Sequence, residues 1–407
     1  MIVHISTSQT GGAGNAARRL HEGLLQQDVD SHFVSALGTP DSAKNLEILA
    51  KRYPRCWQRA AQKCGFGLSP QDRWRRTTAS LDCTNVFSSS IESDSTLLNH
   101  PSVRRASIIN LHWVAGILPW KAFFPSVRCP IVWTLHDMNP FMGIFHYETD
   151  RQRGNAASQK LDTSVRERKR GLLKSGTSPV IVAPSAWLLE QSQNSDLFGG
   201  FRHEHIPYGL NTNFFKPYPK KFARSIFQLP TDRKLMLIVA ERLDDYRKGF
   251  DLLVAAFKLA ELSAEWEVFA VGDGKLPLEN MNCHRIGPIS DERLMALAYA
   301  AADMTVIASR EDNLPNVILE SLCCGTPVIG TPAGGIPEPV VVGRDGVLAK
   351  SLSASDLAFA LKTASAIQFD GDLIARCAAV RYSDSVTAKR YVALYQDILG
   401  TGVSESF

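Results

Sequence analysis

The sequence contains no apolar run long enough to span a bilayer, and it has little excess charge of either sign. Its 407 residues are 44% hydrophobic and 21% charged, with a formal net charge of +4, which is ordinary for a globular protein. A transmembrane helix needs roughly 20 consecutive apolar residues, so none is expected. Repeats, low-complexity tracts and nucleic-acid recognition motifs are also missing, and we expect no nucleic-acid partner.

Cysteine is present but scattered: no pair among the eight has the spacing of a zinc site or a redox motif. Reduced thiols in the cytoplasm are the economical expectation. We expect neither a metal nor another cofactor. Residues 1–6 lack a basic leader and a long apolar segment, so they predict a first strand rather than a signal peptide.

The order of strand and helix signals predicts two similar domains. A chain of 407 residues exceeds the size at which one core usually stops growing, and alternating signals predict parallel sheets flanked by helices. The expected strands are 2–6, 32–36, 107–112, 130–135 and 180–183, then 235–240, 266–271, 284–286, 304–308 and 328–330. The fold class is therefore α/β, with two doubly wound Rossmann-like domains joined near residue 207.

An acidic segment follows the predicted strand at 304–308. Ligands of open α/β sheets lie beyond the carboxyl ends of the strands, and the free amides of a helix start attract anions or hydroxyls. Two carboxylates in such a place can hold the hydroxyls of a sugar or a ribose. The candidate binding residues are Glu311, Asp312, Asn313, Leu314 and Glu320.

This segment, which runs into Gly-Thr-Pro-Val at 325–328, resembles the acidic signature of the retaining glycosyltransferases of family four, including exopolysaccharide-type sugar transferases. Those enzymes have the GT-B fold and carry two carboxylates eight positions apart, as Asp312 and Glu320 are here. The resemblance implies that Glu320 holds the ribose of a nucleotide sugar and that Asp312 and the residues after it hold the sugar ring. The usual first acid of the family is Glu, so Glu311 competes with Asp312 for this role.

Two cations follow the first predicted strand of the second domain. Arg242 stands at the strand end and Lys248 at the start of the next helix, and fixed cations stabilise the charge of a departing diphosphate. The resemblance matches both residues to an Arg and a Lys-Gly around the donor diphosphate, whereas a solvated basic surface is the alternative. The adjacent Arg247 is expected to face solvent. Gly272 and Ile286, at two further strand ends, match positions that lie near the nucleotide.

Glycines also mark the first turn of the chain. Gly12 and Gly14 precede a helix expected over 15–26, so the backbone can approach a ligand closely there. Together with Ala17 they also fit a dinucleotide-binding pattern, which makes an NAD-dependent oxidoreductase an alternative. That pattern expects an acidic residue at the end of the second strand, which has none here. The resemblance instead matches this turn to the glycine-rich loop of family four, and a turn required for packing alone stays open.

The strand predicted at 130–135 runs into His136 and Asp137. A histidine there can hydrogen-bond a sugar hydroxyl or a phosphate, and a near-neutral pKa suits proton transfer. The Thr-Leu-His-Asp sequence resembles that of the family, which implies that His136 contacts the donor sugar or phosphate and leaves Asp137 for acceptor binding or as a base. His112 is expected to be structural.

One segment has no counterpart in the family pattern. Residues 51–76 contain eight Lys and Arg side chains against the single acid Asp72, with Trp57, Phe66 and Trp74 between them. Basic residues mixed with aromatic ones suit an anionic membrane surface. A solvated helical hairpin with its aromatic residues in the core is an equal alternative.

Together the residues and the resemblance predict a retaining GT-B glycosyltransferase that uses a nucleotide-sugar donor and a saccharide or lipid-linked acceptor in surface polysaccharide or glycoconjugate biosynthesis. Residues 1–206 would form the acceptor-side domain with a basic insert at 51–100, residues 207–382 the donor domain, and residues 383–407 a crossover helix and tail, with a central cleft between the domains. The expected location is the cytoplasm, with peripheral contact at the inner face of the membrane left open. A GT-B epimerase or phosphorylase, the NAD-dependent oxidoreductase and a non-catalytic sugar-binding protein are the alternatives.

Overall fold

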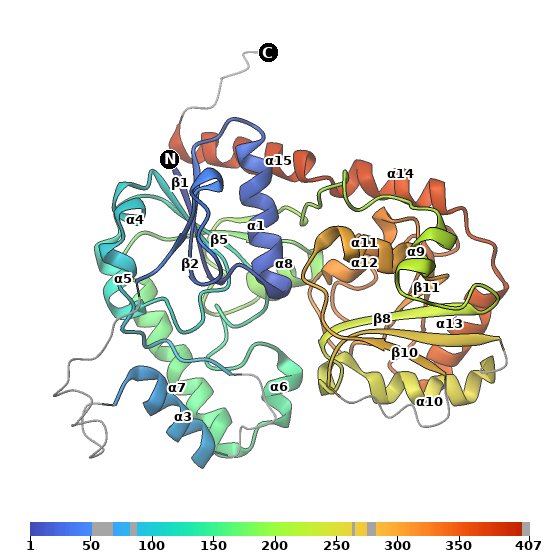
Figure 1. The fold of residues 1–407 in the computed structure, drawn as a ribbon. Helices are drawn as coiled ribbons and strands as arrows, with labels where there is room; N and C mark the ends of the chain where they lie inside the picture. Colours follow the sequence, from blue (N-terminus) through green and yellow to red (C-terminus); the bar gives the residue numbers. More distant parts are fainter. Residues whose placement is uncertain (51–67, 82–87, 263–264, 275–281, 401–407) are drawn as a thin grey trace. The chain divides into compact units, whose positions relative to one another are not determined.

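A computed structural model describes residues 1–50, 68–81, 88–262, 265–274 and 282–400 of the chain (Figure 1). The chain forms two compact units. Unit 1 is Met1–Ile206 with Ala388–Phe407, and unit 2 is Pro207–Thr387.

Unit 1 is built on a parallel sheet with the strand order β3-β2-β1-β4-β5-β6-β7. Its strands are β1 (Ile2–Ser8), β2 (Ser31–Leu37), β3 (Leu46–Ile48), β4 (Ile108–Leu111), β5 (Ile131–Thr134), β6 (Val180–Ala183) and β7 (His203–His205). The central strands β4 and β5 are buried along their whole length, as expected of parallel strands covered on both faces. The order reverses between β1 and β4, which makes this edge a topological switch point.

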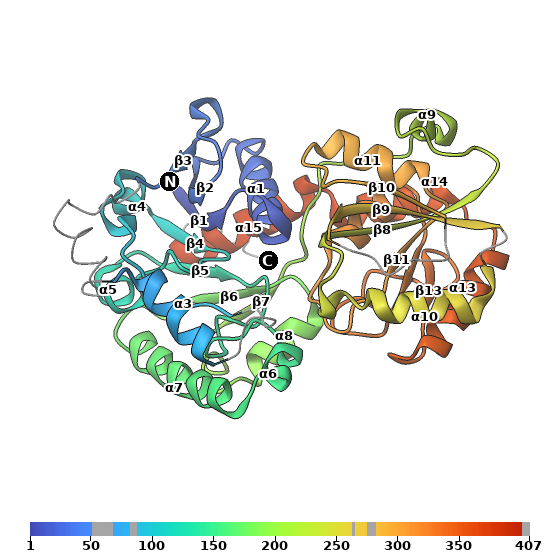
Figure 2. The same ribbon diagram turned by 60° about the horizontal axis from the view of Figure 1, so that its bottom comes forward.

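Helices cover both faces of this sheet (Figures 1 and 2). They are α1 (Gly11–Leu25), α3 (Pro70–Ser80), α4 (Pro101–Arg105), α5 (Trp120–Ser126), α6 (Glu148–Arg153), α7 (Ala156–Leu173), α8 (Ala186–Gln193) and the end of α15 (Asp384–Leu399), with short 3-10 helices η1 (Ser42–Lys44) and η2 (Leu97–Asn99). Alternate strand residues pack against the two layers: Ile131 and Trp133 belong to the core under α5, α7 and α8, whereas Val132 lies in the cluster with α1 and α15.

The helix α15 begins in unit 2 and continues along unit 1. Tyr391, Leu394 and Tyr395 share its buried face. Their phenols are hydrogen-bonded to the sheet: Asn110 Nδ2 donates to Tyr395 Oη at 2.7 Å, and Tyr391 Oη lies 2.9 Å from Thr134 Oγ1. The return of the last helix to the first sheet is confirmed.

Unit 2 contains a second parallel sheet, with the order β10-β9-β8-β11-β12-β13. Its strands are β8 (Lys234–Arg242), β9 (Trp266–Asp273), β10 (Cys283–Ile286), β11 (Met304–Ile307), β12 (Val328–Gly330) and β13 (Gly346–Leu348). Its helices are α9 (Lys220–Ile226), η3 (Tyr246–Lys248), α10 (Phe250–Ala260), α11 (Glu292–Ala301), α12 (Asn316–Cys323), α13 (Ala354–Ala366) and α14 (Gly371–Tyr382). The helices α10 and α13 pack on one face of the sheet, and α9, α11, α12 and α14 lie on the other (Figures 1 and 2).

The two ends of unit 2 are tied to each other. Leu210 N donates to Tyr382 O at 2.8 Å, and Asp384 N donates to Leu210 O at 2.8 Å. The two segments therefore form a short parallel bridge at Leu210 and Ser383.

The sequence prediction of two doubly wound α/β domains is confirmed, and each predicted strand is present with bounds shifted by a few residues at most. The glycine turn is different from the prediction. The helix α1 starts at Gly11, so Gly12 and Gly14 lie in its first turn rather than in a loop before it.

Only part of the basic insert falls within the described residues. Lys51, Arg52, Arg55, Arg59 and Lys63 lie outside them, as do Trp57 and Phe66. The helix α3 is described, and it lies beside α7 (Figures 1 and 2). Its Trp74 packs against the core of unit 1, while Arg75 and Arg76 are exposed.

Candidate functional site

The loops after β8 and β11 meet at the switch point of unit 2, where ligands of such sheets usually lie. Arg310 N donates to Arg247 O at 2.7 Å, which joins the two loops through their backbones. Gly249 adopts a φ of +66°, and a Cβ at this position would lie 2.0 Å from Ala308 O. Only glycine permits so close an approach in this conformation.

A buried charge cluster lies between these loops. Lys248 Nζ is 2.6 Å from Asp312 Oδ2, and Arg247 Nη1 is 3.4 Å from the same oxygen. Burial alone would raise the pKa of Asp312, but Lys248 and Arg247 outweigh it and hold the pKa of this carboxyl below its usual range. Two cations thus share the buried Asp312 carboxylate, and Arg247 Nη2 also lies 3.6 Å from Oδ2 of the more exposed Asp245. Cations held at a sheet edge can attract an anionic ligand.

The two arginines of this loop differ in exposure, and the expectation for Arg247 is contradicted. Arg247 was predicted to face solvent, but its side chain is only 17% exposed and Arg247 Nη1 donates to Glu311 O at 3.0 Å. The side chain of Arg242 is 69% exposed and forms a bidentate pair with Asp244, at 3.0 and 2.7 Å. The prediction for Arg247 is wrong because the 3-10 turn η3 directs this side chain toward the acidic loop.

The acidic segment has its two carboxylates in different surroundings. Asp312 lies in the loop before α12, whereas Glu320 lies on α12 and accepts a hydrogen bond from Tyr299 Oη at 2.7 Å. Asn313 and Leu314 are buried between them. Glu311 is also buried, so burial does not decide between Glu311 and Asp312 as the first acid of the pair. The contact of Lys248 with Asp312 favours Asp312.

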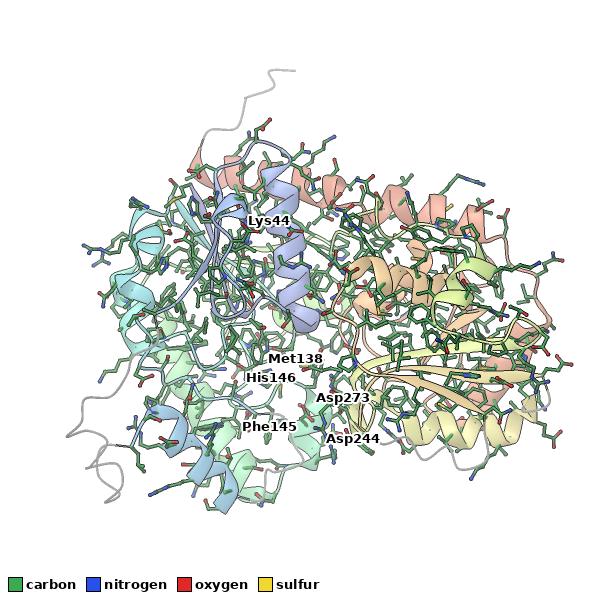
Figure 3. All side chains as sticks on the ribbon, viewed as in Figure 1. Lys44, Met138, Phe145, His146, Asp244 and Asp273 are labelled. Atoms are coloured by element: carbon green, nitrogen blue, oxygen red, sulfur yellow. The ribbon has the colours of Figure 1, made fainter. Side chains whose placement is uncertain are left out.

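Gly272 and Ile286 end two strands at the same edge. Gly272 has a φ of +135°, and a Cβ there would lie 1.8 Å from Ala240 O. This glycine is thus required by the packing of β9 against β8, whatever else it contacts. Ile286 is half-buried at the end of β10. Figure 3 labels Asp244 and Asp273 at this edge of unit 2.

In unit 1 the first turn is tightly packed. A Cβ on Gly14 would lie 2.7 Å from Ser8 O, so this glycine allows α1 to lie close to the end of β1. The packing explanation accounts for Gly14. Gly12, in the same first turn, stays a predicted ligand contact.

His136 follows β5 and joins a line of histidines. His136 Nε2 lies 3.1 Å from His112 Nδ1, and His112 Nε2 lies 2.9 Å from His4 Nδ1. Burial lowers the pKa of His136 to about 4, although Asp137 partly opposes this. The ring is therefore neutral at neutral pH, contrary to the near-neutral titration expected from the sequence.

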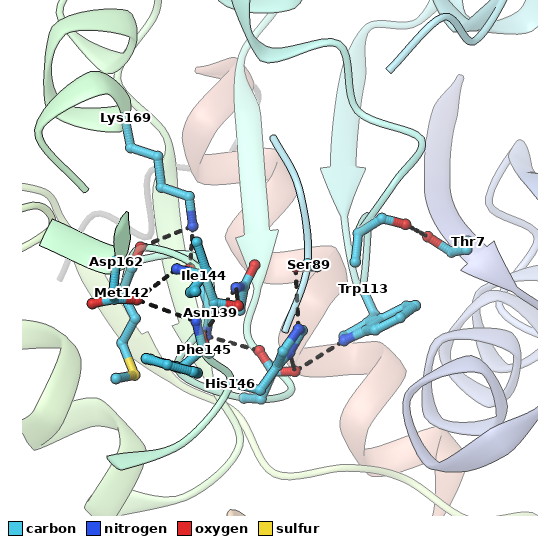
Figure 4. A network of polar contacts seen from close by, with 12 residues as sticks. Thr7, Ser89, Trp113, Asn139, Met142, Ile144, Phe145, His146, Asp162 and Lys169 are labelled. Carbon is cyan, nitrogen blue, oxygen red and sulfur yellow. Dashed lines mark hydrogen bonds and ion pairs between the residues drawn. The ribbon is translucent and has the colours of Figure 1, made fainter. Parts of the chain in front are cut away.

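Asp137 is held by three donors (Figure 4). Its carboxylate accepts from Trp113 Nε1 at 2.9 Å and from Asn139 N at 3.0 Å, and it lies 2.6 Å from His146 Nδ1. Burial would raise the pKa of Asp137, but His146 and the hydrogen bonds outweigh it and lower the pKa. A carboxylate so stabilised in its charged form is a weak base.

Sequence reasoning missed His146, which is fully buried and also lies 3.1 Å from Ser89 Oγ through Nε2. It follows no predicted strand and matches no motif, so only the fold brings it to Asp137.

Two charged residues of α7 hold the loop that carries Asp137 and His146 (Figure 4). Lys169 is fully buried and donates to Asn139 O at 2.5 Å and Met142 O at 2.8 Å. Asp162 accepts from Ile144 N at 2.6 Å. Burial lowers the pKa of Lys169 to about 7, against the opposing effect of Asp162 and Asp137. In the sequence, Lys169 and Asp162 look like ordinary charged residues of an exposed helix, so their buried role could not be predicted.

A small pocket opens beside these groups in unit 1. Aromatic and polar side chains form its wall, with His136, Asp137, Trp113 and Asn139 among them. In the part of the chain that the structure describes, no cluster of three or more His, Cys, Asp or Glu side chains has the arrangement of a metal site. Over the same residues, no helix has the length and hydropathy needed to cross a membrane.

Known proteins are similar to parts of this chain. Residues 233–366 match the family model of glycosyl transferases group 1. A D-inositol 3-phosphate glycosyltransferase of Streptosporangium roseum is 28% identical over 275 residues, 62% of this chain and 60% of that protein. A glycogen synthase of Thermus caldophilus is 30% identical over 193 residues, 45% and 44% of the two chains. The match thus spans less than two thirds of these relatives.

Solved structures extend the similarity in fold to nearly the whole chain. Sucrose-phosphate synthase from Thermosynechococcus elongatus has a TM-score of 0.68 at 19% identity and covers 98% of this chain and 99% of its own. Anabaena HepE, solved with UDP and glucose, has a TM-score of 0.62 at 17% identity, with 97% and 99% covered. The chain therefore has the two-domain GT-B fold, and its residues 233–366 match the family model of glycosyl transferases group 1.

Proposed function

We propose that this protein is a retaining glycosyltransferase of family four that moves a sugar from a nucleotide-diphosphate sugar to an acceptor hydroxyl. The observation that carries the proposal is the cluster of Lys248, Arg247 and Asp312 at the switch point of unit 2, within the segment that matches the group 1 family. A protein of similar fold supports the donor class: HepE was solved with UDP and glucose.

Lys248 and Arg247 would bind the diphosphate. As the bond between the anomeric carbon and the phosphate oxygen breaks, negative charge grows on the diphosphate, and fixed cations stabilise it without a proton transfer. Asp312 holds Lys248 and Arg247 next to each other, and the diphosphate would compete with this carboxylate for Lys248. Arg242 lies on the exposed side of the same strand end and would reach the diphosphate by releasing Asp244.

The acidic residues and backbone would hold the sugar and the ribose. Asp312 and the amides of Asn313 and Leu314 would contact the sugar ring, and Glu320 on α12 the ribose. Gly272 and Ile286, at the ends of β9 and β10, would lie beside the nucleotide.

The reaction would be a front-face displacement. The acceptor oxygen forms its bond to the anomeric carbon on the face from which the diphosphate leaves, and the hydroxyl proton passes to a diphosphate oxygen. This route needs no protein nucleophile. It also fits the low pKa of Asp137, which makes that carboxylate a contact for the acceptor rather than a base.

Unit 1 would select the acceptor through Gly12, His136 and Asp137. The acceptor class that we propose is a saccharide or a lipid-linked sugar used in surface polysaccharide or glycoconjugate synthesis. The exposed arginines of α3 support a peripheral contact with an anionic membrane surface at which such an acceptor would be met.

A thermal-shift screen against nucleotide sugars tests the donor class, because a ligand specific to the native state raises the melting temperature. We expect a shift with one nucleotide-diphosphate sugar and a smaller shift with the free diphosphate. Product analysis with and without acceptor then separates transfer from epimerisation. If the bound sugar is converted to an epimer without any acceptor, the protein is an epimerase and the proposal is wrong. If NAD alone raises the melting temperature, an oxidoreductase takes the place of the proposal.

A further inference from the structure

Arg310, in the loop after β11, contacts the turn that carries the cations of unit 2. Its guanidinium donates to Tyr246 O at 2.7 Å and to both carboxylate oxygens of Asp251, at 2.8 and 2.6 Å. The same guanidinium lies over the Tyr246 ring, 4.1 Å from the ring centroid, and Arg310 N donates to Arg247 O at 2.7 Å. One residue of the acidic segment therefore joins the turn η3 to the start of α10.

The turn that Arg310 contacts is short. Lys248 N donates to Asp245 O at 3.0 Å, and Gly249 N donates to Tyr246 O at 3.1 Å. Turns of the 3-10 type have poorer hydrogen-bond geometry than an α-helix, so contacts with neighbouring segments help to hold them. Arg310 supplies such contacts from the other loop.

An arginine suits this place better than a lysine would. A guanidinium is planar, and it can donate two parallel hydrogen bonds to one carboxylate while its face stacks on an aromatic ring. Arg310 makes both kinds of contact, and its side chain is 19% exposed. Asp251 lies in the first turn of α10, where the helix dipole also favours a negative charge.

The cations of the turn are therefore held from two segments. Asp312 contacts the side chains of Lys248 and Arg247. Arg310 contacts the backbone of the turn instead, and its own charge is matched by Asp251. This arrangement fits a positioning role for Arg310 and leaves the contact with an anionic ligand to the other cations.

We propose that Arg310 is a positioning residue, which holds η3 so that Lys248 and Arg247 lie where the diphosphate of a nucleotide sugar binds. The consequence for ligand binding rests on the proposed function. Arg310 contacts the turn between β8 and α10, whereas Glu320, proposed to hold the ribose, lies on α12. Loss of Arg310 should therefore weaken the binding of a nucleoside diphosphate and leave that of the nucleoside unchanged.

Hydrogen exchange of the backbone amides tests the positioning without any ligand. We expect Arg310→Gln to speed the exchange of residues 245–249 and to leave that of α14 unchanged. The hydrogen bond from Arg310 N does not involve the side chain, so the variant should still fold, as thermal unfolding checks. Unchanged exchange of residues 245–249 in folded Arg310→Gln would overturn the proposal.

Asp251→Asn is a second test, at a side chain that is 60% exposed and can be changed with little risk to folding. It removes the charge of the pair but keeps the contact of Arg310 with Tyr246 O, so it should speed the same exchange less than Arg310→Gln does. The double variant should exchange no faster than Arg310→Gln alone, because residues in contact do not act additively. Effects that add up would refute the coupling of the two side chains.

Two further variants separate geometry from charge. Arg310→Lys keeps the charge but cannot donate to Tyr246 O and to both oxygens of Asp251 together, so it should restore slow exchange only in part. Full recovery in Arg310→Lys would mean that the geometry of the guanidinium is not needed. Arg293 lies over the Phe214 ring at 4.6 Å elsewhere in unit 2, and the matched control Arg293→Gln should leave residues 245–249 unchanged.

Binding gives the functional readout, with UDP, GDP and ADP as probes and with their nucleosides at millimolar concentration. Arg310→Gln should weaken the binding of the diphosphate that the wild type prefers about tenfold, the loss expected for one charge-assisted contact. Equal weakening of the nucleoside in a folded variant would refute a role at the diphosphate. If the wild type binds none of the three diphosphates while exchange responds as expected, the proposed function fails and the positioning of the turn stands.

Discussion

Lys248 contacts the Asp312 carboxylate at 2.6 Å while both side chains are largely buried, and a diphosphate would compete for this cation. Lys248→Ala should therefore lower turnover by roughly 10², the usual cost of removing one charge-stabilising group. Because the variant also leaves Asp312 with one cation fewer, the matched control is the double variant Lys248→Ala with Asp312→Asn. Steady-state kinetics and thermal unfolding measure the two effects separately. Wild-type turnover in a folded single variant would refute the role.

The two arginines allow a direct comparison. Arg247 is buried against the acidic loop and Arg242 is exposed, so we expect Arg247→Gln to reduce both turnover and melting temperature. Arg242→Gln should reduce turnover only, because its contact with Asp244 is an exposed ion pair of small stability. Steady-state kinetics and thermal melts of the two variants test both expectations. Full activity in folded Arg247→Gln would leave the diphosphate role to Lys248 and Arg242.

The choice between the neighbouring acids is also open to test. Asp312 contacts Lys248 at 2.6 Å, so Asp312→Asn should reduce turnover more than Glu311→Gln, and Glu320→Gln should weaken nucleotide binding. Turnover and equilibrium binding of the nucleotide are the measurements. A larger loss in Glu311→Gln would move the sugar-binding role to that residue.

At the scale of elements, α7 and the loop after β5 depend on the buried Lys169. Its pKa is about 7 in the folded chain and about 10.4 in an unfolded one. Between these values the unfolded chain binds more protons, so stability rises with pH, by at most about 1.4 kcal/mol per unit. Below about pH 7 the cost of the buried charge is fully present.

Lys169→Met removes this titration. The difference in unfolding free energy between wild type and variant should therefore change by a few kcal/mol between pH 7 and pH 10, as measured by urea unfolding at several pH values. Arg168, exposed on the same helix, is the matched control, and Arg168→Met should show no such change. A difference that stays constant with pH would mean that Lys169 titrates normally.

The elements themselves were largely predictable. Continuous apolar runs such as 131–134 and 304–307 identify central parallel strands, and their order gives two doubly wound domains. The three-residue strands β3, β7 and β13 carry no such signal. The start of α1 was misplaced because glycines are usually counted against a helix, although Gly11 and Gly12 begin this one.

The sites were predictable only where a strand end marks them. His136, Lys248 and Asp312 each follow a strand, so the sequence places them at a sheet edge. The direction of Arg247 depends on a 3-10 turn, and the contact between Asp137 and His146 depends on a loop held by α7. Neither follows from periodicity, because both arise from contacts between segments distant in sequence.

For the whole molecule, the basic insert predicts attraction to anionic lipid. The protein should pellet with acidic liposomes at low salt and be released as salt rises, because exposed charges are screened beyond about 8–10 Å near physiological ionic strength. Replacing Arg52, Arg55, Arg59, Arg73, Arg75 and Arg76 by Gln should abolish pelleting.

The two tryptophans of the basic insert differ in their expected contribution to lipid binding. Trp74 packs against the core of unit 1, so Trp74→Ala should lower the melting temperature rather than weaken lipid binding, whereas Trp57→Ala tests salt-resistant binding. A wild-type protein that ignores acidic liposomes at low salt would remove the support for a lipid-linked acceptor.

The bridge at Leu210 and Ser383 closes the backbone of unit 2 on itself. Its entry and exit segments are hydrogen-bonded to each other within the unit, so a fragment of residues 207–387 keeps this closure when it is cut from the rest of the chain. Genes could therefore exchange this segment as one cassette, with both junctions at neighbouring points of the fold. If unit 2 binds the donor and unit 1 the acceptor, as proposed, the preference for each could then change independently during the evolution of such chains.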